Sequence, residues 1–115
     1  MKLLTAVIQP TKLQALKEAL YGIGVERMTV CDAHGYGRQH GQTEMFRGHE
    51  YRANLLRKVV LEIVVNDDFV DRTIETIRSV ARTNPDGNIG DGKIFIMTVN
   101  NTIRIGGLAR GPEAV

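Results

Sequence analysis

Hydrophobic positions follow two different spacings in the first third of the chain. Residues 2–9 (KLLTAVIQ) form an apolar run that predicts a strand. After Pro10 the spacing becomes helical, with apolar residues at Leu13, Leu16, Leu20 and Ile23. Gly22 and Gly24 predict the end of this helix, because glycine is common at helix C-termini. Residues 25–34 (VERMTVCDAH) then predict a second strand.

The second half of the chain repeats this order of elements. Residues 56–65 predict a third strand, in which one set of alternating positions is fully apolar: Val59, Leu61, Ile63 and Val65. Asn66 predicts a helix N-cap, and Asp67 and Asp68 suit the positive end of a helix dipole. The helix is predicted over 67–82, with its apolar face at Val70, Ile74, Ile77 and Val80/Ala81. Residues 93–99 (KIFIMTV) predict the last strand.

The order β-α-β-β-α-β predicts an α+β ferredoxin-like domain spanning 1–115, with an antiparallel sheet and both helices on one face. In the second set of alternating positions of the third strand, Val60 and Val64 are apolar as well, beside Lys58 and Glu62. Since the helices cover only one face, the other face needs a partner, and the sequence predicts a homo-oligomer. The tail after residue 100 is expected to end loosely, after a short helical turn near Thr102.

A polar segment from Tyr36 to Leu55 separates the second and third predicted strands. It has no regular period, so the sequence predicts a loop without regular structure. Loops of this length are uncommon in small domains and are usually functional or disordered. The segment contains arginines, glutamates, glycines and Tyr51 rather than a repeated composition, which favours a role in contacting another molecule.

Composition favours an ordinary globular protein, with 43% hydrophobic and 24% charged residues. No run approaches the about 20 apolar residues of a membrane span, and the apolar start is too soon broken by Pro10 to suit a signal peptide. A cytoplasmic location is the expectation, and the single cysteine, Cys31, fits a reducing compartment and is expected to pack in its strand. The net charge of +2 is a weak argument for nucleic acid.

Two glycine-rich segments suit the binding of an anion. Residues 87–93 read G-x-x-x-x-G-K, yet Ile94 replaces the Ser or Thr of a P-loop and a strand follows, so a P-loop NTPase is excluded. Either the glycines let backbone N–H groups approach an anion beside Lys93, or the segment is a flexible loop with a surface lysine. Residues 35–41 also combine glycines with Arg38. The predicted topology puts both segments near Lys58, while Arg104 follows the last strand.

Catalytic motifs are weak in this sequence. His34, His40 and His49 are not spaced as a metal site with Cys31, and no Ser-His-Asp arrangement can be argued. Binding is therefore favoured over catalysis, although slow ATP hydrolysis stays an alternative. An RNA-binding ferredoxin-like module is a further alternative, but such modules stack bases on aromatic side chains, and Phe95 is the only aromatic residue in the predicted strands.

These motifs together resemble the PII nitrogen-regulatory signal transduction proteins, over essentially the whole chain. The segment GYGRQHGQTEMFRGHEYRANLLRKVVLEIVV is similar to the T-loop of that family and its following strand. GDGKIFI is similar to the B-loop and last strand, and TIRI to the start of the C-loop. We therefore expect a T-loop at 36–55, a B-loop at 83–92 and a C-terminal loop at 101–115.

The resemblance implies a compact homotrimer that binds ATP or ADP in clefts between subunits. It also implies binding of 2-oxoglutarate together with Mg²⁺ and ATP. Ammonium transporters, nitrogen-assimilation enzymes or regulators would be the partners, contacted through the T-loop. Tyr51 matches the tyrosine that the family modifies by uridylylation. No membrane insertion and no direct contact with nucleic acid are implied.

Site residues carry over from the family position by position. The expected nucleotide-binding residues are Thr29, Gly35, Gly37, Arg38, Gln39, Val64, Gly90, Asp91, Gly92, Lys93 and Arg104. Those expected for 2-oxoglutarate are Gln39, His40, Gly41, Lys58 and Gly90. Gln39 would also hold the Mg²⁺ that accompanies ATP, and Arg104 would reach the phosphates from the neighbouring subunit.

The chain departs from the family pattern at two places. The B-loop segment TNPDGNIGDG is three residues longer than the usual T-G-K-I-G-D-G. Gly106 stands where the family has a second C-loop arginine, which contacts the outer phosphates. Because a hydrogen bond to a charged group contributes roughly 1.5–3 kcal/mol, we expect an altered ATP/ADP preference. A nucleotide-sensing regulator of another pathway is the alternative function.

Overall fold

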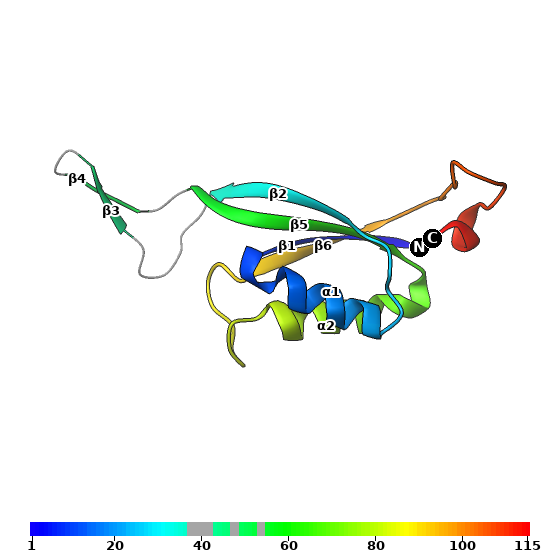
Figure 1. The fold of residues 1–115 in the computed structure, drawn as a ribbon, viewed down its shortest axis with the longest axis horizontal. Coiled ribbons are helices and arrows are strands. Elements are labelled where there is room, and N and C mark those ends of the chain that lie inside the picture. The colour runs from blue at the N-terminus through cyan, green and yellow to red at the C-terminus, as the bar shows by residue number, and fades with distance from the viewer. Residues whose placement is uncertain (37–42, 47–48, 53–54) are drawn as a thin grey trace.

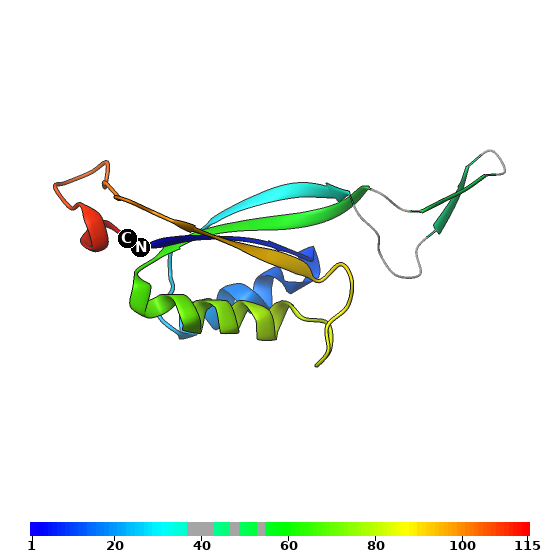
Figure 2. The same cartoon turned by 180° about the vertical axis from the view of Figure 1, so that it is seen from behind.

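Four strands form one antiparallel sheet in the order β2-β5-β1-β6 (Figure 1). The computed structural model describes residues 1–36, 43–46, 49–52 and 55–115. The strands of the sheet are β1 (Lys2–Ile8), β2 (Thr29–Tyr36), β5 (Leu55–Val65) and β6 (Gly92–Thr98). Helices α1 (Leu13–Gly22) and α2 (Val70–Ala81) lie on the same face of the sheet, each preceded by a short 3-10 turn (Figures 1 and 2). The predicted ferredoxin-like fold is therefore confirmed.

The core lies between the two helices and the sheet. Leu4, Ala6 and Ile8 of β1 are buried, as are the four alternating residues of β5 that the sequence pattern places on one face. From the helices, Leu16, Leu20, Ile77 and Ala81 complete this core. Thr73 of α2 is also fully buried, and its hydroxyl donates a 2.6 Å hydrogen bond to the carbonyl oxygen of Phe69, which removes the cost of burying a polar group.

The start of β2 differs from its predicted position at residue 25. The N–H of Val25 donates to the carbonyl oxygen of Leu20, and that of Gly24 to Tyr21, which is the double bond pattern of a Schellman cap. Gly24 adopts a φ of +90°, which glycine tolerates, and Val25 is buried against the helix end. Val25 therefore caps α1 instead of starting the strand, and β2 begins four residues later.

The segment between β2 and β5 contains two short strands, although the sequence pattern predicts no regular structure there. β3 (Thr43–Phe46) and β4 (His49–Arg52) pair antiparallel as a separate two-stranded sheet. In that pairing Glu44 lies opposite Tyr51. β2 also extends to Tyr36, so the expectation that Phe95 is the only strand aromatic is wrong.

The polar residues before α2, Asn66 and Asp67, make contacts that the sequence pattern does not predict. Asn66 occupies the N-cap position, but its side chain makes no capping bond. Its amide group instead donates a 3.1 Å hydrogen bond to the carbonyl oxygen of Pro112 in the C-terminal segment. Asp67 contacts the N-terminal ammonium of Met1 at 2.9 Å, and that hydrogen bond and charge lower the pKa of Asp67.

The C-terminal segment has regular contacts, contrary to the expected loose end. Ile103 and Arg110 form an antiparallel bridge, and residues Gly111–Ala114 form a 3-10 turn. The helical turn expected near Thr102 is absent from its predicted place. The carbonyl oxygen of Thr102 instead accepts a 2.7 Å hydrogen bond from the N–H of Gly111, beside this bridge. Figure 1 shows the two chain ends close together, at the end of the sheet opposite β3 and β4.

The face of the sheet that the helices leave open carries alternating residues from all four strands. Strand register aligns one row of this face across the sheet: Cys31, Val60, Val7 and Lys93. Phe95 and Met97 of β6 are more than half exposed on the same face, at 53% and 54%. Cys31 is exposed too, so the expectation that it packs within the chain is wrong. In the described part of the chain, no helix has the length and apolar character needed to cross a bilayer.

Candidate anion-binding site

Lys58 joins β5 to the loop that connects α2 and β6. Its side-chain ammonium donates a 2.8 Å hydrogen bond to the carbonyl oxygen of Gly90. The contact is partly buried and links residues 32 positions apart in the chain. The topology alone predicts Lys58 near the G-x-x-x-x-G-K segment, and this placement is confirmed. An ammonium group at this position provides a positive charge beside a glycine-rich loop.

Gly35 lies beside Lys58 on the neighbouring strand. Ala33 is the register partner of Lys58, and a Cβ placed on Gly35 would lie 3.3 Å from the Cγ atom of Lys58. This is tighter than ordinary van der Waals contact, so glycine leaves space for the lysine stem. The base of the long polar segment and the second glycine-rich loop therefore meet at one corner of the sheet.

Gly92 begins β6 in a conformation that other residues rarely adopt. Its φ is +121°, and a Cβ at this position would overlap the carbonyl oxygen of Val7 on β1. Only glycine allows β1 and the loop to approach so closely. The close approach fixes the place where Lys93 leaves the loop.

Asp91 organises the loop through hydrogen bonds to its own neighbours. One carboxylate oxygen accepts the N–H groups of Thr83 and Asn88, at 3.0 and 2.8 Å. The other accepts the hydroxyl of Thr83 and the side-chain amide of Gln9. Burial raises the pKa of Asp91, but the hydrogen bonds from Thr83 and Asn88 outweigh it and, with nearby Lys12, hold the pKa below its usual range. Asp91 therefore closes the loop as a carboxylate, with both oxygens occupied.

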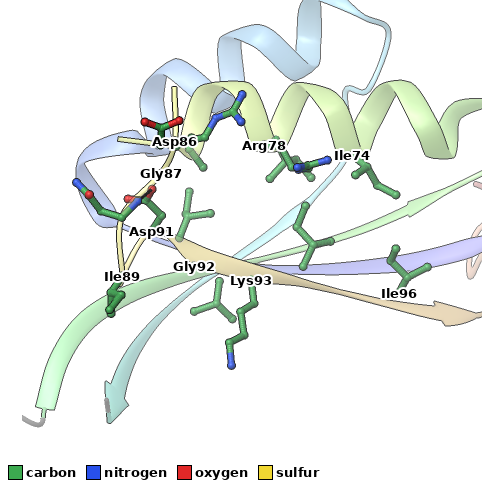
Figure 3. A pocket seen from close by; sticks show the side chains of 16 residues that line it. Ile74, Arg78, Asp86, Gly87, Ile89, Asp91, Gly92, Lys93 and Ile96 are labelled. Carbon is green, nitrogen blue, oxygen red and sulfur yellow. Dashed lines mark hydrogen bonds between the residues drawn. The ribbon is translucent and has the colours of Figure 1, made fainter. Parts of the chain in front are cut away.

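Lys93 extends from β6 away from the helices (Figure 3). Its register partner on β1 is Val7, which belongs to the open face, so Lys93 shares that face with Lys58. Both lysines lie beside the Gly90–Gly92 turn. Together they give this corner two cations, which suits phosphate or carboxylate groups.

A cavity of about 770 Å³ lies on the other side of β6. It is bordered by α2, β6 and the loop over residues 86–92, and Figure 3 shows Ile74 and Ile96 on its two sides. Six of its sixteen lining residues are isoleucines, and Arg78 and Arg82 are among the charged ones. We assign the anion site to the open face rather than to this cavity, because Lys58 contacts Gly90 and Gly35 there. Lys93 shares that face by register and also borders the cavity.

Three predicted nucleotide-binding residues lie at the opposite end of the sheet: Thr29, Val64 and Arg104. Thr29 starts β2 and Val64 is the second-last residue of β5. Val64 is six positions from Lys58, which is about 20 Å along an extended strand. Arg104 follows β6, and its guanidinium donates to the carbonyl oxygen of Glu113 at 3.2 Å. One chain therefore does not bring these three residues to the Lys58 corner.

Other predicted residues lie outside the described part of the chain: Gly37, Arg38, Gln39, His40 and Gly41. Tyr51 belongs to β4. Gly106 lies in the C-terminal segment, and a Cβ added there would meet no atom within 4 Å, so a larger side chain has room at this position. In the described residues, no group of three or more His, Cys, Asp or Glu side chains is placed to hold a metal ion.

Gln9 and Thr83 are site residues that the sequence pattern does not predict. The amide of Gln9 donates to the carbonyl oxygen of Gly90 at 3.4 Å, beside the Lys58 contact. Gln9 and Gly90 are 81 positions apart, so no local pattern could pair them. The sequence offers one hint of this contact. Gln9 is a polar residue at the end of the first strand, and the loop before β6 lies at that same end of the sheet.

Comparison with known proteins gives one consistent family. The family model described as "Nitrogen regulatory protein P-II" matches residues 1–107. The chain is 47% identical to the nitrogen regulatory protein P-II of Rhodospirillum rubrum, over the full length of both chains. It is 47% identical to the nitrogen regulatory protein GlnK1 of Methanosarcina mazei, covering 100% of this chain and 97% of that one. Over 105 residues, 91% of each chain, it is 50% identical to the nitrogen regulatory protein P-II 1 of Escherichia coli.

Proposed function

Because the chain belongs to the PII family of nitrogen regulatory proteins, we propose that it senses ATP or ADP and 2-oxoglutarate and passes the result to nitrogen-metabolism partners. The observation that carries this proposal is the corner formed by Lys58, Gly90 and Lys93. There, two lysines and a tightly approached glycine loop offer positive charge and backbone N–H groups to an anion. Lys58 would take a carboxylate of 2-oxoglutarate, and the B-loop would take the nucleotide phosphates.

A homotrimer would complete the site. Val64 lies about 20 Å and Thr29 about 13 Å along the strands from Lys58 of the same chain, and Arg104 follows the far end of β6. If the open faces of three chains pack together, these residues can reach the corner of a neighbouring chain. The exposed side chains of Phe95 and Met97 on that face support such an interface. Light scattering should give three chains per particle, and Phe95→Asp should reduce this mass while the exposed Tyr21→Asp on α1 should not.

The residues of this corner fit a nucleotide in part. The glycines leave room for phosphates, and the lysines have the correct charge. When bound, Mg²⁺ would neutralise phosphate charge, and Gln39 is the residue that we propose to hold it. Asp91 does not fit the role of a ligand, because all its acceptor positions face Thr83, Asn88 and Gln9. We therefore propose that Asp91 shapes the loop and leaves phosphate contact to its neighbours.

The long segment over 36–55 is the proposed output. Its base joins the corner through Gly35, and β3 and β4 form a separate hairpin within it. Ligands at the base would shift the hairpin between arrangements that a partner distinguishes, which is a recurring type of switch. We propose as partners an ammonium transporter, a nitrogen-assimilation enzyme or a regulator. Uridylylation of Tyr51 would add bulk and negative charge to this surface.

Gly106 supports a second form of the proposal. A regulator without the second C-loop arginine would hold the outer phosphates less firmly, and its preference for ATP over ADP would be lower. Such a protein could sense nucleotides for another pathway. We place either form in the cytoplasm, where both ligands occur, and assign it a regulatory role rather than a catalytic one.

Calorimetry tests the proposed function directly. ATP and ADP should each release heat on binding, and each should compete with the other. 2-Oxoglutarate should bind only when Mg²⁺ and ATP are present. Absence of binding by either nucleotide would contradict the proposal, and tight RNA binding at physiological salt would favour the ferredoxin-like RNA reader instead.

A further inference from the structure

Gln9 lies at the meeting point of β1 and the loop before β6. It is followed by Pro10, and a residue before proline is restricted to extended backbone, which Gln9 adopts with φ −69° and ψ 138°. Its half-buried side-chain amide donates to the carbonyl oxygen of Gly90 at 3.4 Å and to a carboxylate oxygen of Asp91 at 3.3 Å. One amide group therefore contacts two consecutive loop residues.

The two acceptors of Gln9 have different roles in the loop. The carbonyl oxygen of Gly90 also accepts the ammonium of Lys58, so this oxygen sets where Lys58 lies. The carboxylate of Asp91 holds the N–H groups of Thr83 and Asn88, so it sets the shape of the loop. Gln9, directly after β1, has a side chain that contacts both features.

The neutral amide suits this position. Asp91 brings a negative charge, while Lys58 and Lys12 bring positive charges nearby. An amide donates hydrogen bonds to both acceptors without adding to either charge. Without it, Asp91 still closes the loop and Lys58 still reaches Gly90, but the loop loses its direct side-chain tether to β1.

We propose that Gln9 is a positioning residue, which fixes the Gly90–Lys93 turn relative to Lys58 so that both meet one anion. This inference rests on the proposed function, because the anion is taken to be a nucleotide phosphate or 2-oxoglutarate. Because these hydrogen bonds would act on the anion only through the position of the turn, their loss should weaken anion binding about tenfold.

Four proteins test this role: the wild type, Gln9→Met, Gln9→Lys and Gln14→Met. Methionine has a similar size but no donor, whereas lysine keeps a donor at similar reach. Gln14 is an exposed glutamine of α1 that bonds Glu18, so it controls for the loss of any surface amide. ATP affinity is measured by calorimetry, and hydrogen exchange of residues 83–92 is measured without nucleotide.

Gln9→Met should weaken ATP binding about tenfold and speed exchange in 83–92, with little change in melting temperature. Gln9→Lys should restore slow exchange, which is the measure of rescue because lysine also adds a charge that attracts ATP, and Gln14→Met should match the wild type. Unchanged exchange in Gln9→Met, or no rescue by lysine, would overturn the positioning role. If Gln9→Met does not fold, Gln9→Asn, whose amide falls short of both acceptors, must show the same faster exchange. A wild type that binds no nucleotide would refute the proposed function, while the exchange measurement would still decide the tether.

Discussion

The ammonium of Lys58 on β5 and the carbonyl oxygen of Gly90 are 2.8 Å apart, and this hydrogen bond joins the base of the long polar segment to the loop before β6. An ammonium group has three donors, so Lys58 can hold Gly90 and an anion at the same time. A ligand bound at this corner would therefore change the contacts of both loops.

Replacing Lys58 with alanine should abolish most 2-oxoglutarate binding. A charge-assisted hydrogen bond contributes roughly 1.5–3 kcal/mol, which corresponds to a loss of about 10- to 150-fold in affinity. Arg57→Ala is the matched control, because Arg57 has the same charge but points to the other face of β5. Calorimetry in the presence of Mg²⁺ and ATP measures both variants, and equal losses would argue against a specific contact at Lys58.

Gly92→Ala should destabilise the fold. The added Cβ would overlap the carbonyl oxygen of Val7, and a φ of +121° is unfavourable for alanine. Backbone strain of this kind costs about 1–3 kcal/mol before the steric overlap is counted. Thermal unfolding should show a clear fall in melting temperature for this variant, whereas Gly106→Ala, with open space around its Cβ, should unfold like the wild type. A Gly92→Ala protein with unchanged stability would contradict the close approach of β1 and the loop.

Asp91→Asn should loosen the loop, because an amide nitrogen would then face the N–H groups that Asp91 accepts. The hydrogen bonds lower the pKa of Asp91 in the folded chain below its ordinary value of 3.8. The stability that its ionised form contributes is therefore present above that value and is lost as the pH falls through the lower, folded pKa. Urea unfolding should show a difference between wild type and Asp91→Asn that is constant near neutral pH and shrinks at pH values below 3.8. A stability difference between the two proteins that grows as the pH falls would contradict a lowered pKa of Asp91 in the folded chain.

Gly106→Arg should strengthen ATP binding. The position has open space, and its φ lies outside the left-handed region, so arginine fits without strain. One added contact to a phosphate should raise the affinity for ATP about tenfold or more, and the affinity for ADP by less. Gly106→Gln, of similar length but uncharged, controls for bulk. Paired titrations with ATP and ADP measure the change, and an equal gain for both variants would show that charge is not the cause.

Much of the fold could be predicted because its signals are local. Val59, Leu61 and Ile63 occupy one set of alternating positions that is apolar throughout, which identifies the buried face of β5, and all three are buried in the structure. The start of β2 was misplaced for a local reason as well. Val25 is apolar, as a strand residue would be, yet it packs against the end of α1 as part of the helix cap. Only tertiary packing distinguishes a strand residue from a capping residue here.

The C-terminal segment could be predicted less well, because its contacts come from distant residues. Asn66 donates to Pro112, 46 positions away, so a residue typical of an N-cap holds the tail instead. Composition rich in glycine gives no sign of this contact. The bridge between Ile103 and Arg110 likewise depends on the path of the chain after β6.

The candidate site was predicted where topology alone brings residues together. Lys58 and Gly90 meet because β5 and the loop before β6 share one corner of a ferredoxin-like sheet. The role of Asp91 could not be predicted, since the sequence shows a carboxylate but not the three residues that occupy its oxygens. Gln9 was missed for the same reason.

The distance between Lys58 and Arg104, at opposite ends of the sheet, has a consequence for mixtures of variants. In the proposed trimer each cleft would take Lys58 from one chain and Arg104 from the next. Homotrimers of Lys58→Ala or of Arg104→Ala would then contain no intact cleft. A trimer that mixes the two would always contain one, because one Arg104→Ala chain would place its own Lys58 beside the Arg104 of a Lys58→Ala chain. Two inactive proteins, refolded together, would thus regain part of the binding that neither has alone.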